Sequence, residues 1–242
     1  MTSIDETLIH HAVSRIRDAE VYSEPFPHIF FGNFFPADVY AEILSSIPDD
    51  SVFRQLNGEN TRLSFALHNS SSKLDPKIRD LWQSVSAMLM STELEQAIRT
   101  RLFEGLEIRR RAENLSSADE LPMYARPMIY KDLEGYRIVP HPDTRKKIVT
   151  MQIYCPPDES LCDLGTTFYK LSLKGLLKPS SRFLEPAKTF PFLPNVGYAF
   201  VVLKPFHTLL KTSWHGRAPI TMGASKHRLS ILNTFYRRHK ID

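Results

Sequence analysis

The feature that most constrains the fold is a change of pattern at about Pro122. Before this point, apolar residues recur mainly at helical spacing, whereas after it the chain breaks into short extended segments separated by Pro, Gly and Asp. The candidate strands cover residues 124–130, 135–140, 147–155, 166–172, 196–203 and 227–236. Several short strands after a helical first third are typical of a β-barrel or a double-sheet jelly roll backed by helices.

The N-terminal third predicts helices joined by polar segments. Helices are expected over residues 4–17, from Pro36, from Pro76, and through Leu102 after a candidate capping box formed by Thr92 and Glu95, with a short strand at Ile29–Phe31. Residues 46–75 are predicted as a loop region on the surface or over a pocket, and residues 109–121 as a loop or strand edge. We predict one integrated domain, in which residues 1–121 form a helical support region and residues 122–242 form the β core.

Composition indicates an ordinary globular protein. The 242 residues are 42% hydrophobic and 24% charged, which is enough apolar material for a sizeable core. No apolar run approaches the roughly 18 residues that a membrane span needs, and the N-terminus has neither the basic nor the apolar region of a secretory signal. Cys155 and Cys162 do not make a disulfide framework. We therefore expect a cytoplasmic protein with reduced thiols and no membrane partner.

The positive charge is modest and dispersed. The formal net charge is +4, and three short basic clusters lie at Arg109–Arg111, Arg145–Lys147 and Arg237–Lys240. Because these clusters lack interleaved aromatic residues, we interpret them as solvated surface and expect no nucleic-acid partner. Attraction of an anionic substrate is the alternative interpretation.

The triplet His141-Pro142-Asp143 is the strongest candidate for chemistry. In an extended chain, residues two apart point to the same side, so this imidazole and this carboxylate can share one metal ion. His215 can complete the set from a distant strand. Two histidines and one carboxylate on one face of a metal leave the opposite positions open, which is typical of non-haem Fe(II) sites.

Taken in order, the motifs of the C-terminal half resemble those of the 2-oxoglutarate and Fe(II)-dependent oxygenases, in the prolyl hydroxylase-like branch. The resemblance covers about residues 122–237 and is carried by Tyr130, Gly135-Tyr136, His141-Pro142-Asp143, Val149–Tyr154, Asn195–Phe200, Ser213-Trp214-His215-Gly216 and Arg228-Leu229-Ser230. The openings Pro25–Ile29 and Phe34–Pro36 are also similar to that branch. The resemblance implies a double-stranded β-helix fold.

The resemblance also implies roles for individual residues. His141, Asp143 and His215 would be the iron ligands, with His207 as the competing candidate for the third position. Arg228 would bind the distal carboxylate of 2-oxoglutarate, because a planar guanidinium matches a carboxylate bidentately; Lys226 and His227 are the alternatives. Ser230 and Tyr154 would add hydrogen bonds to this carboxylate, Tyr130 would line the pocket, and Thr150 and Gln152 share the strand face of Tyr154.

The implied activity is hydroxylation of an unactivated C–H bond, with Fe(II), 2-oxoglutarate and O2, and with decarboxylation of 2-oxoglutarate to succinate. A small-molecule substrate such as an amino acid, sugar or natural product is favoured over a peptidyl hydroxylase acting on a protein, and a non-catalytic jelly-roll binding module is the third alternative. Two departures from the family pattern are the segment Leu164–Tyr169, where relatives carry a Gly-Gly-x-Leu-like motif, and the 13-residue interval from His215 to Arg228. Nothing in the sequence indicates the oligomeric state.

Overall fold

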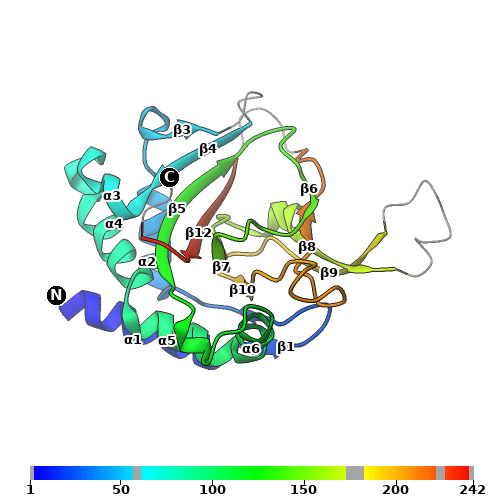
Figure 1. Cartoon of the computed structure of the whole chain (residues 1–242). Coiled ribbons are helices and arrows are strands. Elements are labelled where there is room, and N and C mark those ends of the chain that lie inside the picture. Colours follow the sequence, from blue (N-terminus) through cyan, green and yellow to red (C-terminus); the bar gives the residue numbers. More distant parts are fainter. Residues whose placement is uncertain (1–2, 57–60, 173–182, 222–226, 240–242) are drawn as a thin grey trace.

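Two antiparallel β-sheets form the centre of the molecule (Figure 1). The computed structural model describes residues 3–56, 61–172, 183–221 and 227–239. The larger sheet has eight strands in the spatial order β1 (Glu20–Tyr22), β2 (His28–Phe31), β10 (Gly197–Val201), β7 (Lys147–Tyr154), β12 (Arg228–Tyr236), β5 (Tyr124–Asp132), β4 (Arg62–Ala66) and β3 (Arg54–Gln55). The smaller sheet has the order β6 (Ile138–His141), β11 (His215–Arg217), β8 (Thr166–Leu171) and β9 (Leu184–Phe190).

Helices from the N-terminal half cover the outer face of the larger sheet (Figure 1). They are α1 (Ser3–Arg17), α2 (Ala37–Ser45), α3 (Leu67–Ser70), α4 (Pro76–Leu89), α5 (Thr92–Arg101) and α6 (Phe103–Ala112), with 3-10 turns η1 (Asp50–Val52), η2 (Ser71–Lys73), η3 (Ala118–Glu120) and η4 (Glu159–Leu164). The side chain of Asp75 caps α4 by accepting from the Lys77 amide, where Pro76 suits the first turn. Helix α5 is capped by Ser91, which accepts from the Leu94 amide, rather than by the predicted Thr92.

Strand β7 shows how period-2 alternation divides the interior into two cores. Val149, Met151 and Ile153 face the helices and belong to the larger hydrophobic cluster. The alternate residues Thr150, Gln152 and Tyr154 face the smaller sheet. Since both faces of this central strand are buried, a shift of register by one residue would place Thr150 and Gln152 in the apolar core.

Aromatic rings fill one part of the space between the two sheets. Phe168 on β8 lies 4.6 Å from Phe26 and 4.8 Å from Phe190 between ring centroids, and the rings of Tyr198 and Phe200 on β10 pack against it. Burying a phenylalanine side chain contributes about 1.5–3 kcal/mol. This aromatic cluster joins the sheets on one side, while polar side chains face the space between them on the other.

The predicted fold class is confirmed: the molecule is mostly β, with two facing antiparallel sheets backed by helices. The six predicted strands of the C-terminal half occur as β5, β6, β7, β8, β10 and β12, and β9 and β11 were not predicted. The first 121 residues also supply β1–β4, so the region expected to be a helical support contributes half of the strands of the larger sheet.

Two segments predicted as loops are ordered into regular structure. Within residues 46–75, β4 pairs along β5, with Arg62 opposite Asp132. Residues 109–112 belong to α6, so the predicted loop or strand edge was wrong there. Arg109 is also not the solvated surface residue that its basic cluster suggested, because its buried guanidinium donates to the carbonyls of Lys147, Val202 and Arg145.

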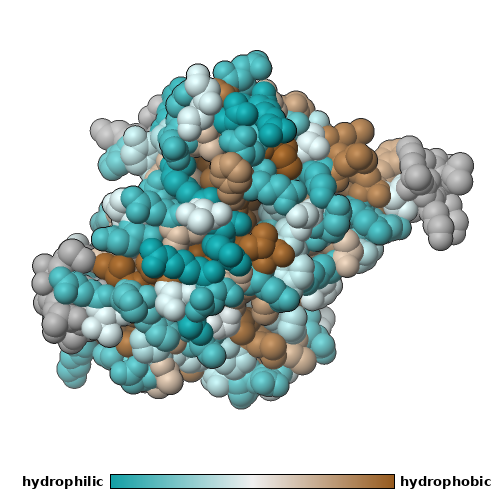
Figure 2. All heavy atoms as spheres, turned by 90° about the horizontal axis from the view of Figure 1, so that it is seen from below, coloured by the Kyte–Doolittle hydropathy of each residue, from teal (hydrophilic) through white to brown (hydrophobic). Residues whose placement is uncertain are grey.

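The face formed by the lower elements of Figure 1 is largely hydrophilic, with hydrophobic residues in separate patches (Figure 2). Phe103 on α6 is among the exposed hydrophobic side chains. Within the described ranges of the chain, no helix has the length and apolar character required to span a bilayer. Cys155 and Cys162 are both free thiols, as predicted.

Candidate functional site

The smaller sheet places His141 and His215 side by side. His141 ends β6, His215 begins β11, and the two residues are direct partners in the antiparallel register. Their ring centroids are 4.6 Å apart. The close pairing needs Gly216, because a Cβ at that position would lie 2.7 Å from the Ile138 carbonyl oxygen and 3.0 Å from the Pro140 nitrogen.

Backbone carbonyls fix the tautomer of both imidazoles. The Nδ1 atom of His141 lies 3.0 Å from the Val139 carbonyl oxygen, and Nδ1 of His215 lies 3.0 Å from the Ser213 carbonyl oxygen. Since a carbonyl only accepts hydrogen bonds, each Nδ1 carries a proton, and in the neutral form of the ring Nε2 presents the lone pair. Burial lowers the pKa of His215 to about 4, against the opposing effect of Asp143, so this ring is neutral at pH 7. A neutral imidazole whose Nδ1–H is held by a carbonyl directs its Nε2 lone pair toward a metal.

The carboxylate of Asp143 lies between the two histidines, in the loop that joins β6 to β7. Its Oδ1 is 3.9 Å from Nε2 of His141, and its Oδ2 is 3.8 Å from Nε2 of His215. Lys147 donates to Oδ1 at 2.6 Å, and Thr150 donates to Oδ2 at 2.6 Å. Burial by itself would raise the pKa of Asp143, but Lys147, His215 and Thr150 outweigh it and hold this pKa well below its ordinary value. Asp143 is therefore ionised.

The donor set fits a divalent transition metal. The candidate ligand atoms of His141, Asp143 and His215 all lie within 4.8 Å of one another, and no other group of three such residues occurs in the described parts of the chain. Two neutral imidazole nitrogens and one carboxylate oxygen suit Fe(II) among other first-row metals. His207, the competing candidate, lies elsewhere: its Nε2 is 3.3 Å from Glu113, in a buried cluster with Arg109.

A cavity of about 470 Å³ opens over the three candidate ligands and is hereafter called the mouth cavity. Its walls come from both sheets. The lining includes Arg62, Tyr136, Arg137, Ile138, Val139, His141, Asp143, Lys147, Thr150, Gln152, Thr166, Tyr198, His215, Gly216, Arg217 and Leu232. Thr150 and Gln152 line it as the strand pattern predicted. The ring of Phe200 packs 4.8 Å from His215 and shields that ligand on its inner side.

An unusual group of charges forms the inner wall of the mouth cavity. Asp132, fully buried at the end of β5, is paired with three arginines. Its carboxylate oxygens lie 3.1 Å from Arg62, 3.0 Å from Arg217 and 3.2 Å from Arg228. Burial would raise the pKa of Asp132, but the three guanidinium charges outweigh this effect and hold the pKa below its ordinary value. One carboxylate thus faces three permanent positive charges.

Arg228 begins β12 and is completely buried behind the cavity wall. Its Nε donates to the Leu164 carbonyl oxygen at 2.7 Å and its Nη1 to Asp132, while Nη2 has no hydrogen-bond partner among the described residues. The hydroxyl of Tyr154 is likewise buried with no partner in the described part of the chain, and the Tyr154 ring lies 4.8 Å from the Arg228 guanidinium carbon. Two adjacent buried donors without partners mark a place suited to an anionic group.

Ser230 and Tyr130 contact residues of the cavity wall without lining the cavity themselves. Ser230 is buried and accepts a hydrogen bond of 3.0 Å from Gln152, whose amide does line the cavity. Tyr130 lies on β5, with its ring 4.1 Å from the Arg62 guanidinium carbon. Lys226 falls outside the described residues. His227 precedes β12 and is part-buried.

Sequence reasoning missed Arg62 and Arg217. Arg217 follows His215 by two residues on β11, so the same alternation that placed Asp143 with His141 was available as a signal for it. Arg62 offered no comparable signal, because its strand was interpreted as a loop and its partner strand lies more than sixty residues away. Both guanidinium groups reach the mouth cavity.

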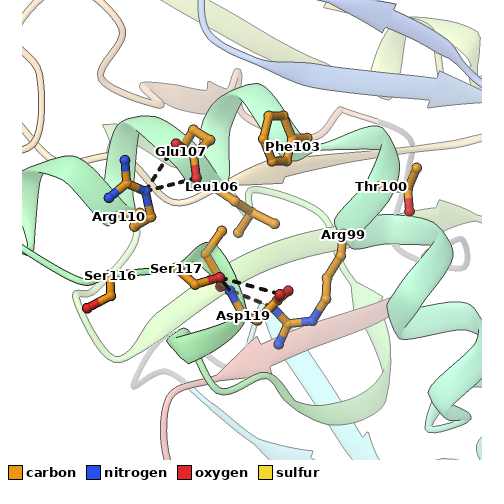
Figure 3. A pocket seen from close by; sticks show the side chains of 10 residues that line it. Arg99, Thr100, Phe103, Leu106, Glu107, Arg110, Ser116, Ser117 and Asp119 are labelled. Atoms are coloured by element: carbon orange, nitrogen blue, oxygen red, sulfur yellow. Dashed lines mark hydrogen bonds and ion pairs between the residues drawn. The ribbon is translucent and has the colours of Figure 1, made fainter.

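A second cavity, of about 380 Å³, lies among α5, α6 and η3 and is hereafter called the helical cavity (Figure 3). Its charged groups are paired locally. Arg110 donates to Glu107 at 2.9 Å, and Ser117 contacts Asp119 (Figure 3). Arg99 pairs with Glu95 at 2.8 Å and donates to the Leu121 carbonyl oxygen. None of these groups converges on a common point as the three candidate ligands do.

No protein-family model matches the sequence, and no curated protein matches it by sequence. Solved structures are similar in fold. A prolyl hydroxylase from Trichoplax adhaerens, in complex with a hypoxia-inducible factor peptide fragment, superposes with a TM-score of 0.54 over 97% of this chain and 91% of that chain, at 13% identity. A prolyl-4-hydroxylase from Pseudomonas putida gives 0.48 over 96% and 100% at 14% identity, and a 2OG-Fe(II) oxygenase-family oxidoreductase from Burkholderia pseudomallei gives 0.49 over 95% and 90% at 9% identity.

The chain therefore has the double-stranded β-helix fold of the prolyl hydroxylase-like oxygenases, as the resemblance of its motifs implied. At 13% identity the similarity concerns the fold alone. Inferences about chemistry rest on the side chains of this chain.

Proposed function

We propose that this chain is an Fe(II)- and 2-oxoglutarate-dependent dioxygenase that hydroxylates an unactivated C–H bond of a small-molecule substrate and converts 2-oxoglutarate to succinate. The observation that carries the proposal is the convergence of His141, Asp143 and His215 at the mouth cavity. Bound by two imidazole nitrogens and one carboxylate oxygen, an iron ion would keep further positions for other ligands.

His141, Asp143 and His215 would hold the iron. Bound there, the iron and 2-oxoglutarate would supply the oxidising chemistry with O2. The protein's own task is orientation: the carbonyls of Val139 and Ser213 keep both Nε2 atoms free for the metal. Lys147 and Thr150 hold the two oxygens of Asp143 in a fixed plane.

Arg228 and Tyr154 would bind the distal carboxylate of 2-oxoglutarate. Nη2 of Arg228 and the hydroxyl of Tyr154 are both fully buried donors, and neither has a hydrogen-bond partner within the ranges that the structure describes. A carboxylate between them would satisfy two buried groups at once, which favours binding because each unsatisfied group costs about 1–3 kcal/mol. Ser230 accepts a hydrogen bond from Gln152 and would act indirectly, by positioning the Gln152 amide that lines the cavity.

A small substrate is favoured by the size of the mouth cavity. Its volume of about 470 Å³ lies within the range typical of small-molecule sites. A peptidyl hydroxylase would use the same three metal ligands but needs a groove for several residues of its partner. A screen for succinate release with small metabolites and with peptides would distinguish these two substrate classes.

Calorimetric titration of 2-oxoglutarate into the anaerobic Fe(II)-loaded protein tests the proposal directly. We expect saturable binding at one site in the wild type. Asp143→Ala should abolish both this metal-dependent binding and coupled succinate production, because it removes the only anionic ligand. Asp119→Ala, which removes a carboxylate from the helical cavity, is the matched control and should change neither. Wild-type succinate production by Asp143→Ala would rule out the proposed metal centre.

A further inference from the structure

The mouth cavity carries more positive charge than its own carboxylates balance. Among the described lining residues, Arg62, Arg137, Lys147 and Arg217 are cationic, whereas Asp143 alone is a carboxylate. Just behind this wall, Arg228 adds a further positive charge and Asp132 a negative one. Buried charges of one sign are costly without partners, so the wall favours bound anions.

Iron and 2-oxoglutarate together do not remove this excess. Fe(II) brings two positive charges and 2-oxoglutarate brings two negative charges, so their joint binding leaves the local balance unchanged. The distal carboxylate of 2-oxoglutarate can occupy the free donors of Arg228 and Tyr154, but it leaves the guanidinium groups of Arg62 and Arg217 without an added anion.

Arg217 is the clearest sign of a further ligand. Its side chain is 4% exposed and lines the mouth cavity, and only its Nη1 is bonded, to Asp132 at 3.0 Å. Its Nε and Nη2 have no hydrogen-bond partner among the described residues. This guanidinium is therefore desolvated without being fully compensated.

Arg62 is held rigidly on the same side of the cavity. Its Nη1 donates to the hydroxyl of Tyr136, its Nε pairs with Asp132 at 3.1 Å, and its guanidinium lies over the Tyr130 ring at 4.1 Å and the Tyr136 ring at 4.8 Å. The Arg217 guanidinium lies 5.1 Å from the same Tyr136 ring. Two planar guanidinium groups thus flank one tyrosine and share one carboxylate, a preorganised arrangement for an oxyanion.

We infer that Arg62 and Arg217 form an anion site for the hydroxylation substrate, which carries a carboxylate or phosphate group. This inference rests on the proposed function, and it deepens it by assigning a charge to the substrate. Arg228 and Tyr154 serve the cosubstrate, whereas Arg62 and Arg217 bind and orient the molecule to be oxidised. Neither of these two arginines was identified from the sequence motifs.

The test uses the full chain, loaded with Fe(II) under anaerobic conditions and saturated with 2-oxoglutarate. Inorganic phosphate and acetate are titrated separately by calorimetry, with ionic strength held constant by sodium chloride. We expect saturable binding of at least one of these probes at a single site. Tighter binding of phosphate indicates a phosphorylated substrate, and tighter binding of acetate indicates a carboxylated one.

Substitutions separate the two anion sites. Arg62→Gln and Arg217→Gln should each weaken binding of the probe by about tenfold or more, because each removes a charge-assisted donor, while 2-oxoglutarate affinity changes less than about threefold. Arg228→Gln should give the opposite pattern. Arg62→Lys retains the charge without the planar fork and should lie between Arg62→Gln and the wild type. Arg110→Gln, at the helical cavity, removes the same charge elsewhere and should alter neither affinity.

Each remaining outcome has a distinct meaning. The absence of saturable binding of both probes, with 2-oxoglutarate binding intact, overturns the anion site alone. A loss of 2-oxoglutarate affinity in Arg62→Gln and Arg217→Gln as large as in Arg228→Gln also overturns it, because those residues would then belong to the cosubstrate. The absence of 2-oxoglutarate binding to the wild type, with phosphate still bound through Arg62 and Arg217, overturns the proposed function.

Arg62→Gln leaves Asp132 with two arginine partners, so folding of this variant is expected and is checked by its melting temperature.

Discussion

The mouth cavity and the helical cavity have similar volumes, about 470 and 380 Å³, but they differ in the balance of positive and negative side chains that line them. In the helical cavity two arginines face two carboxylates, and the Arg110–Glu107 pair closes within one helical turn. In the mouth cavity four cations face Asp143, and buried donors of Arg217 have no partner among the described residues. The mouth cavity therefore retains buried donors that the proposed anionic ligand would satisfy, whereas the charges of the helical cavity are balanced by nearby residues.

This difference also separates two kinds of ion pair. The Arg110 and Glu107 side chains are 23% and 19% exposed, so water competes for both partners and the pair contributes little to stability. Asp132 and Arg228 are almost fully buried, so removal of one charge leaves the other uncompensated in a medium of low dielectric constant. The two cavities thus differ in the burial and balance of their charges more than in their volumes.

The largest effect on stability is expected for Asp132→Asn. The substitution preserves the shape of the side chain but leaves three guanidinium groups without their shared carboxylate. We expect a loss of about 3–5 kcal/mol in the free energy of unfolding, measured by urea denaturation. Glu107→Gln is the matched control in the helical cavity and should cost at most about 1 kcal/mol. Equal losses would erase the distinction between the two cavities.

The pH dependence of the stability difference between wild type and Asp132→Asn provides an independent test. Because the folded-state pKa of Asp132 is depressed, its contribution to stability is complete above the pKa of the unfolded state and is lost as pH falls through the folded-state value. Asp132→Asn removes this contribution, so the difference in stability between wild type and variant should shrink below about pH 4. A difference that grew on acidification would have the wrong sign.

The sequence predicted the parts of the site that follow from short-range rules. His141 and Asp143 are two residues apart, so alternation alone placed both on one side of the chain. The motif Ser213-Trp214-His215-Gly216 identified His215 as a candidate. Its position beside His141 and Asp143 depends on the pairing of β11 with β6, across more than seventy residues. The geometry brings these three residues together, and their role as metal ligands stays part of the proposal.

Other features depended on long-range packing that no local pattern reports. The strand character of β4 is weak over five residues and becomes effective only when it pairs with β5, so Arg62 was assigned to a loop. Arg109 belongs to a run of three arginines that suggested solvent exposure, yet its buried side chain donates to three carbonyls, two of them at Arg145 and Lys147 in and after the loop that carries Asp143. Burial of a long charged side chain is decided by such distant acceptors.

A smaller effect is expected for Thr150→Val, which tests the hydrogen bond that supports Asp143, one of the three proposed metal ligands. The substitution keeps the side-chain shape but removes the hydroxyl that donates to Oδ2 of Asp143 at 2.6 Å. We expect Fe(II) affinity to fall about 10- to 100-fold, as is typical for partners of metal ligands, measured by competition with a chelator. Ser117→Ala removes a capping hydroxyl at the helical cavity and should leave metal affinity unchanged. An unchanged affinity in Thr150→Val would show that Lys147 alone orients the carboxylate.

The smallest effect is expected for Arg137→Gln, because this side chain lies exposed at the rim of the mouth cavity. An exposed charge attracts anions mainly at long range, so phosphate binding should weaken less than about threefold at low salt. Since the Debye length is about 10 Å at 0.1 M ionic strength and about 3 Å at 1 M, this difference should vanish in 1 M sodium chloride. The loss caused by Arg217→Gln should persist there, because its donors are buried and screened far less. Titrations of both variants at the two ionic strengths check this contrast, and a salt-resistant loss in Arg137→Gln would move the anion site from the inner wall to the rim.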